Sequence, residues 1–232
     1  MKSKLIYIII IIIFFIIIGY STYTYISQPK YKGRGYCSLQ SDYVHPESFP
    51  NFINNDECEY IIKKATPLFS ESKLVSGGTD NIRKSETAWL SNSDPIIKKI
   101  IEKTCKITNI PFNHSEKLQV VKYRPGGFYN AHYDASCDNL KECVEFEKNG
   151  GQRVLTMIIY LNNGYEGGET EFPNLKKKYK LDKGGSLLFY SLEKNGNKCH
   201  PLSLHSGTPV IKGEKYIANV WLREKPYKVV PE

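Results

Sequence analysis

The chain has 232 residues, 41% of them hydrophobic, and carries a formal net charge of +8. This length supports one well-buried core and is short for two catalytic domains, and the composition excludes a disordered or fibrous protein. The basic residues are scattered along the chain, so a nucleic-acid partner is not expected.

The first 27 residues predict a membrane segment. Lys2 and Lys4 precede an apolar run from Leu5 to about Tyr25. A helix needs about 20 mostly apolar residues to span a bilayer, whereas a cleaved signal peptide has a shorter apolar core and a small-residue cleavage site. We expect one transmembrane signal anchor over residues 1–27, with a cleaved signal as the alternative. The anchored form would be a single-pass membrane protein, and either form would place the rest of the chain in the endoplasmic reticulum or secretory lumen.

Residues 28–47 are polar, contain Pro and Gly, and are expected to form a linker to a domain over residues 48–232. An even number of cysteines suits an oxidising lumen. Cys137 and Cys143 are close enough in sequence to close one loop, although each could equally be a buried free thiol. The pairing of the six cysteines cannot be deduced from sequence alone. They are Cys37, Cys58, Cys105, Cys137, Cys143 and Cys199.

Two helices are predicted in the first half of the domain. Asn55 or Asp56 could cap the first helix, whose apolar residues form one face. Asp94 and Pro95 are typical of the start of a second helix, which would present several isoleucines to the core. After Phe112 the chain changes to short β-rich runs separated by turn residues. These runs are Leu118–Tyr123, Val154–Leu161, Glu169–Phe172, Ser186–Tyr190 and Tyr216–Leu222.

Helices followed by strands predict an α+β domain with a jelly-roll or sandwich core. The charged segment 138–151 ends in glycines and is predicted to be an inserted loop. It directly follows the residues that carry the strongest chemical signal.

That signal is a pair of metal-ligand side chains. His132 and Asp134 are separated by one residue, and side chains alternate across a strand, so both would face one interior point while Tyr133 faces away. Two histidines and one carboxylate hold Fe(II) on one face in non-haem oxygenases and leave positions open for a co-substrate and O2. His205 is the natural third ligand, and His200 is its main competitor.

Lys215 supplies the second part of the pattern. A 2-oxoglutarate molecule that chelates iron through its keto-acid end needs a cation for its far carboxylate, and a lysine offers a point charge with hydrogen bonds. Gly213, just before it, allows a tight turn. We therefore predict a catalytic centre made of His132, Asp134, His205 and Lys215 for Fe(II), 2-oxoglutarate and O2.

At this point the segment from about Asn51 to Arg223 resembles the catalytic domain of the prolyl 4-hydroxylases, which belong to the Fe(II)/2-oxoglutarate dioxygenases. The matching stretches are 83–90 (RKSETAWL), 119–123 (QVVKY), 127–134 (GFYNAHYD), 153–162 (RVLTMIIYLN), 167–173 (GGETEFP), 183–189 (KGGSLLF), 204–210 (LHSGTPV) and 213–223 (GEKYIANVWLR). The segment from Ala135 to Gln152 is longer and more charged than is common in the family, and it could reshape substrate access.

The resemblance implies a double-stranded β-helix flanked by N-terminal helices, with His132, Asp134 and His205 as the iron ligands. It pairs Lys215 with the C5 carboxylate of 2-oxoglutarate. It places Tyr123 and Tyr160, and less clearly Thr156, in that pocket. It also places five residues along a peptide groove, although Arg153 or Glu116 could be a surface charge and Trp221 a core residue. The five are Arg83, Ser85, Glu116, Arg153 and Trp221.

The activity implied by the resemblance is hydroxylation of peptidyl proline to 4-hydroxyproline, coupled to conversion of 2-oxoglutarate and O2 to succinate and CO2. Ascorbate would keep the iron reduced. A proline-containing, extended peptide fits a groove lined by aromatic residues. The alternatives are an oxygenase acting on peptidyl lysine or another substrate, and a membrane-anchored binding module without catalysis. The oligomeric state is not predicted.

Overall fold

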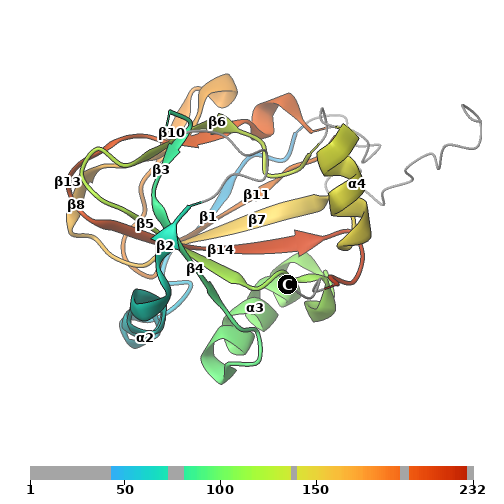
Figure 1. Ribbon diagram of the computed structural model, residues 1–232, viewed down its shortest axis with the longest axis horizontal. Coiled ribbons are helices and arrows are strands. Elements are labelled where there is room, and N and C mark those ends of the chain that lie inside the picture. The colour runs from blue at the N-terminus through green and yellow to red at the C-terminus, as the bar shows by residue number, and fades with distance from the viewer. Residues whose placement is uncertain (1–42, 73–80, 137–139, 194–198, 229–232) are drawn as a thin grey trace, which may run out of the picture. The chain divides into compact units, whose positions relative to one another are not determined.

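Two antiparallel sheets form the framework of the domain (Figure 1). The computed structural model describes residues 43–72, 81–136, 140–193 and 199–228. The larger sheet has the order β1-β11-β7-β14-β5-β4-β2, the smaller has the order β10-β9-β12-β6-β3, and β13 pairs with β8 in a separate ribbon. This architecture is the jelly-roll core that the sequence predicted.

The strands of the larger sheet are β1 (Glu47–Phe49), β2 (Ser70–Glu71), β4 (Glu86–Leu90), β5 (Leu118–Tyr123), β7 (Arg153–Tyr160), β11 (Ser186–Tyr190) and β14 (Lys215–Arg223). Those of the smaller sheet are β3 (Arg83–Lys84), β6 (Phe128–His132), β9 (Thr170–Phe172), β10 (Lys177–Tyr179) and β12 (His205–Gly207). The ribbon consists of β8 (Tyr165–Gly167) and β13 (Val210–Gly213). All five β-rich runs predicted from the sequence are therefore strands.

Three α-helices are described: α2 (Asn55–Ala65), α3 (Pro95–Thr108) and α4 (Leu140–Lys148). Four 3-10 turns complete the described elements: η1 (Thr66–Leu68), η2 (Phe112–His114), η3 (Pro173–Leu175) and η4 (Pro201–Ser203). The cap of α3 is Asp94, as predicted, and its carboxylate accepts from the Ile96 and Ile97 amides. The cap of α2 is Asn54, one residue before the predicted positions, because Asn54 and Glu57 form a reciprocal capping box.

The larger sheet buries both of its faces, and strand alternation decides which residues each face receives. One face packs against α2 and α3 through a core that includes Ile61, Ile100 and Val220. The opposite face packs toward the smaller sheet through a second cluster that includes Ile158 and Phe189. The functional residues described below lie on this second, inner face.

The structure corrects two predicted boundaries. Tyr43 is 7% exposed and its hydroxyl donates to the Tyr190 carbonyl, so the packed domain begins before residue 48. The segment 138–151, predicted to be a loop, contains helix α4. Its charged sequence does not predict a helix, but contacts of Phe146 with distant residues stabilise one.

The predicted anchor at residues 1–27 and most of the linker lie outside the described residues. Within the described ranges, no helix has both the length and the apolar character needed to cross a bilayer.

The cysteines also differ from expectation. The suggested Cys137–Cys143 bridge is wrong, because Cys143 keeps its thiol and donates it to the Ser136 carbonyl. Cys58 and Cys105 are buried free thiols. Cys199 is disulfide-bonded.

Candidate active site

The three predicted metal ligands converge. His132 ends β6, His205 begins β12, and the two are direct partners in the antiparallel ladder between these strands. Asp134 follows two residues after His132, just beyond the end of the strand. One ligand atom from each side chain lies within 4.8 Å of the other two. The competing residue, His200, lies elsewhere, where it stacks on Tyr43 and accepts from the Leu202 amide.

Both histidines are held in the tautomer that a metal needs. The Nδ1 atom of His132 lies 2.8 Å from the Asn130 carbonyl, and that of His205 lies 3.0 Å from the Ser203 carbonyl. Because a carbonyl accepts, each Nδ1 carries the proton and each Nε2 keeps its lone pair. The Nε2 atoms lie 3.8 Å and 3.7 Å from the Asp134 carboxylate. Burial, with His205 nearby, lowers the pKa of His132 to about 3, so the ring is neutral near pH 7.

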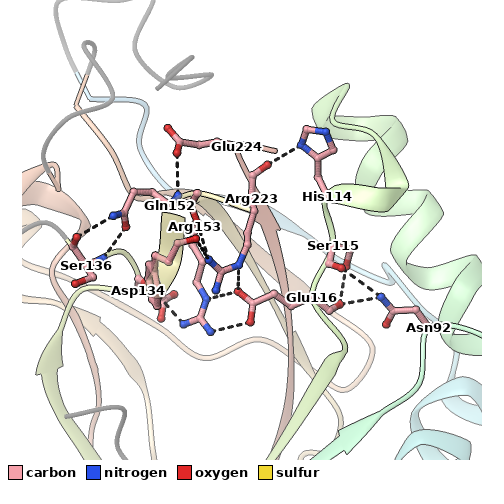
Figure 2. A network of polar contacts seen from close by, with 12 residues as sticks. Asn92, His114, Ser115, Glu116, Asp134, Ser136, Gln152, Arg153, Arg223 and Glu224 are labelled. Atoms are coloured by element: carbon pink, nitrogen blue, oxygen red, sulfur yellow. Dashed lines mark hydrogen bonds and ion pairs between the residues drawn. The ribbon is translucent and has the colours of Figure 1, made fainter. Parts of the chain in front are cut away.

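Two neighbours hold Asp134 in place. Thr156 on β7 donates a short hydrogen bond from Oγ1 to Asp134 Oδ2. Arg153 at the start of β7 donates to the Asp134 main-chain carbonyl over 3.4 Å (Figure 2). Burial raises the pKa of the Asp134 carboxyl, but His205, His132 and Arg153 together hold it below its ordinary value. The carboxylate is therefore ionised and oriented toward the two imidazoles.

The triad opens into a cavity of about 320 Å³ between the two sheets. Lys215, at the start of β14, also lines this cavity and is only 2% exposed. Its Nζ lies 5.3 Å from the ring centre of Tyr123 and 5.8 Å from that of Tyr160, and no described carboxylate forms an ion pair with it. A buried ammonium without a counter-ion is suited to an anionic ligand.

Tyr123 lines the cavity beside Lys215, as predicted, but Tyr160 does not. The Tyr160 hydroxyl instead shares a 2.8 Å hydrogen bond with Thr170, which does line the cavity. Sequence reasoning assigned no role to Thr170. The available signal was its place in the matching stretch 167–173, where strand alternation puts Thr170 and Phe172 on the buried face.

Three of the five predicted groove residues reach the cavity: Arg83, Arg153 and Trp221. The guanidinium of Arg83 lies 4.6 Å from the Tyr129 ring centre, and that of Arg153 lies 3.5 Å from the Trp221 ring centre. Several other lining residues were given no role from the sequence. Four of them lie in the matching stretches: Trp89, Gln119, Tyr129 and Asn219. Ile82 and Phe146 lie outside those stretches.

The other two predicted groove residues bind the arginines that line the cavity. Ser85 accepts a 2.7 Å hydrogen bond from Arg83 Nε. Glu116 is 3% exposed, and both of its oxygens accept from Arg153, at 2.6 and 2.8 Å (Figure 2). Neither residue lines the cavity, so each orients an arginine that does.

Comparison with known proteins agrees with this geometry. Residues 118–223 match the family model of the 2OG-Fe(II) oxygenase superfamily. A protein of Acanthamoeba polyphaga mimivirus, named as a candidate prolyl 4-hydroxylase, is 46% identical over 192 residues, which cover 83% of this chain and 79% of that protein. The chain belongs to the prolyl 4-hydroxylase family.

Two further members of the family support the assignment. Prolyl 4-hydroxylase 1 of Arabidopsis thaliana is 34% identical over 75% of this chain and 67% of its own length. The crystal structure of a viral collagen prolyl hydroxylase from Paramecium bursaria Chlorella virus 1, a complex with 2-oxoglutarate, superposes with a TM-score of 0.62 at 32% identity. It covers 78% of this chain and 96% of that one.

The residues present fit the groups that the superfamily name implies. Two imidazole nitrogens and one carboxylate are a ligand set for Fe(II) that leaves coordination positions open for other ligands. The Lys215 ammonium, which forms no ion pair with a described carboxylate, lies in the same cavity and fits the far carboxylate of 2-oxoglutarate. The protein is therefore an Fe(II)- and 2-oxoglutarate-dependent oxygenase that uses O2.

Proposed function

We propose that the protein hydroxylates C4 of prolyl residues in an extended peptide. The observation that carries the proposal is one cavity that contains the metal triad and an unpaired lysine, with arginine and aromatic side chains in its lining. Bound Fe(II), 2-oxoglutarate and O2 supply the oxidant for the substrate C–H bond, and 2-oxoglutarate leaves as succinate and CO2.

Different residues would bind the metal and the co-substrate. His132, Asp134 and His205 would hold the metal. Lys215 would hold the C5 carboxylate of 2-oxoglutarate, and the Tyr123 and Thr170 hydroxyls lie in the same cavity. Burial of these groups would limit the access of water to the reacting atoms and would fix the orientation of the bound molecules.

The peptide would lie along the part of the cavity lining that contains Arg83, Arg153 and Trp221. These groups are planar, and Trp89 adds a partly exposed ring 5.9 Å from that of Trp221. Planar aromatic surfaces suit a polyproline II peptide, which presents its rings without a large loss of conformational entropy. Ser85 and Glu116 would act by orienting Arg83 and Arg153.

The proposed compartment is the lumen of the secretory pathway, reached through the N-terminal apolar segment. The disulfide at Cys199 supports this location, because disulfides persist in oxidising compartments. Ascorbate is proposed as the reductant that maintains Fe(II).

The test is incubation of the purified protein with Fe(II), 2-oxoglutarate, ascorbate and proline-rich peptides. Mass spectrometry should find one oxygen added at proline, and succinate should form in equal amount. The His132→Ala variant should bind less iron and give neither product. Turnover on lysyl peptides alone would contradict the proposal. Iron binding without turnover of any peptide would favour a binding module.

A further inference from the structure

Helix α4 forms part of the lining of the cavity. It lies where β7 begins and β14 ends (Figure 1). Phe146, near its C-terminal end, is 7% exposed and lines the cavity, whereas Val144 on the same helix is 56% exposed. The helix therefore has one residue directed at the site and a nearby residue directed at solvent.

The Phe146 ring packs against two arginines. The guanidinium carbon of Arg223 lies 4.6 Å from its ring centre, and that of Arg153 lies 5.4 Å away. Glu116 accepts from the Nε atoms of both arginines, at 2.7 and 2.6 Å (Figure 2). Phe146 therefore contacts two planar groups that share one carboxylate as their ion-pair partner.

The backbone of Phe146 is also fixed. Its carbonyl accepts from the Gly151 amide at 2.8 Å, and Arg223 Nη1 donates to the Gly151 carbonyl at 2.6 Å. Arg223 Nη1 lies 3.4 Å from the Phe146 carbonyl as well. A shift of this backbone would break buried, charge-assisted hydrogen bonds, so the ring projects from a fixed position and packs against both guanidinium groups.

The cavity, with a volume of about 320 Å³, would hold the metal, 2-oxoglutarate and the target prolyl ring. Arg153 links Phe146 to Trp221, because its guanidinium also lies 3.5 Å from the Trp221 ring centre. Phe146 thus extends the planar lining at which the peptide is proposed to lie.

We infer that Phe146 is a specificity-determining residue that contacts the side chain adjoining the target proline and restricts it to small or prolyl side chains. The inference rests on the proposed function. A fixed apolar ring in the lining of a binding cavity discriminates by size, and a change of one methylene in such a site changes kcat/KM by about 10-fold or more.

The test uses two series of proline-containing peptides, with Ala, Leu or Phe placed before the target proline in one series and after it in the other. The wild-type protein should prefer Ala in at least one series. Phe146→Ala should raise the kcat/KM for Phe relative to Ala by about 10-fold in that series. Phe146→Leu should shift the ratio in the same direction by a smaller factor, and this variant replaces Phe146→Ala in the test if the alanine variant does not fold. Val144→Ala is the matched control on the same helix and should keep the wild-type ratio.

The KM for 2-oxoglutarate should stay within about twofold of wild type in every variant, because in the described part of the chain the Phe146 ring packs on Arg153 and Arg223, whereas Lys215 lies beside Tyr123 and Tyr160. A merely structural role would instead change both KM values and leave the peptide ratio unaltered. Wild-type protein that shows no size preference in either series, or a folded Phe146→Ala protein with an unchanged ratio, would overturn the inference alone. Failure of every prolyl peptide with wild-type protein would overturn the proposed function and this inference together.

Discussion

The carboxylate of Asp134 is the most constrained ligand of the metal site. Thr156 donates to Oδ2, and the imidazoles of His132 and His205 lie within 3.8 Å of its oxygens. Its main-chain carbonyl accepts from Arg153. Such contacts fix a ligand in its binding orientation before the metal arrives, and their loss weakens metal binding.

Thr156→Val should therefore lower the affinity for Fe(II) by about 10-fold or more, because the side chain keeps its shape but cannot orient Asp134. Anaerobic calorimetric titration with Fe(II) would measure the change. Thr66→Val is the control, since Thr66 is exposed and its hydroxyl only contacts the Ile62 carbonyl. Equal iron affinity in both variants would show that the hydrogen bond does not orient the ligand.

The protonation of Lys215 is also set by its surroundings. Burial lowers its pKa to about 7, although Glu169 acts in the opposite direction. The free protein should then lose the ammonium proton as the pH rises above 7. A bound carboxylate favours the charged form, so 2-oxoglutarate should take up a proton when it binds at higher pH.

The expected result is a Kd for 2-oxoglutarate that rises toward about 10-fold per pH unit above pH 7. Calorimetry in buffers of different ionisation enthalpy should detect about one proton taken up near pH 8.5. Lys215→Arg should remove both effects, because an arginine stays charged throughout this range. Proton uptake that persists in the arginine variant would assign the effect to another group.

At the scale of elements, β14 connects the active site to the core. Lys215, Ile217, Asn219 and Trp221 line the cavity, whereas Ala218, Val220 and Leu222 belong to the core cluster with the helices. A slip of one residue would exchange the two sets, so the start of the strand has to be defined. Gly213 precedes it with φ +75°.

Gly213→Ala should destabilise the fold by about 2 kcal/mol or more, because the backbone conformation is strained for other residues. An added Cβ would also lie 2.0 Å from the Gly164 carbonyl oxygen. Gly164→Ala is the matched control, since a Cβ there meets nothing within 4 Å, and its effect should stay within about 0.5 kcal/mol. Denaturant unfolding of the two variants compares them, and equal stabilities would refute this role of Gly213.

At the scale of the whole domain, a buried network around Glu116 joins segments that are far apart in the sequence (Figure 2). Glu116 binds Arg153 at the start of β7 and Arg223 at the end of β14. Arg223 extends the network to α4 through the Phe146 carbonyl. One carboxylate therefore forms ion pairs with two buried guanidinium groups.

Glu116→Gln should cost about 3 kcal/mol of folding free energy at pH 7, because it leaves buried charge uncompensated. Glu102→Gln, which affects an exposed pair with Lys98, should cost less than about 1 kcal/mol. Unfolding with denaturant at several pH values would measure both, and equal costs would contradict the role of the network.

The stabilising effect of Glu116 should depend on pH. Burial raises the pKa of Glu116, but Arg153 and Arg223 together hold it below the ordinary value of 4.5. Its stabilisation is therefore fully present above pH 4.5 and is lost as the pH falls through the lowered pKa. The difference between wild type and Glu116→Gln should shrink in that acidic range.

Much of this architecture follows from local sequence. The capping residue Asp94, the β-rich runs and the spacing of His132 and Asp134 depend on neighbours a few residues away, so short patterns were enough to predict them. Helix α4 was missed because its stability depends on Phe146 docking against Arg153 and Arg223, which are distant contacts for a charged segment.

By itself, the sequence predicted the metal-ligand set, the lysine, two helices and the five strands after Phe112, because capping, strand patterns and ligand chemistry are local properties. Only the tertiary structure decided that Arg153 faces the cavity while Glu116 lies behind it, and that Thr170 rather than Tyr160 lines the site. Those outcomes depend on which strands become neighbours and on how far each side chain extends. Neither can be read from the order of residues along the chain.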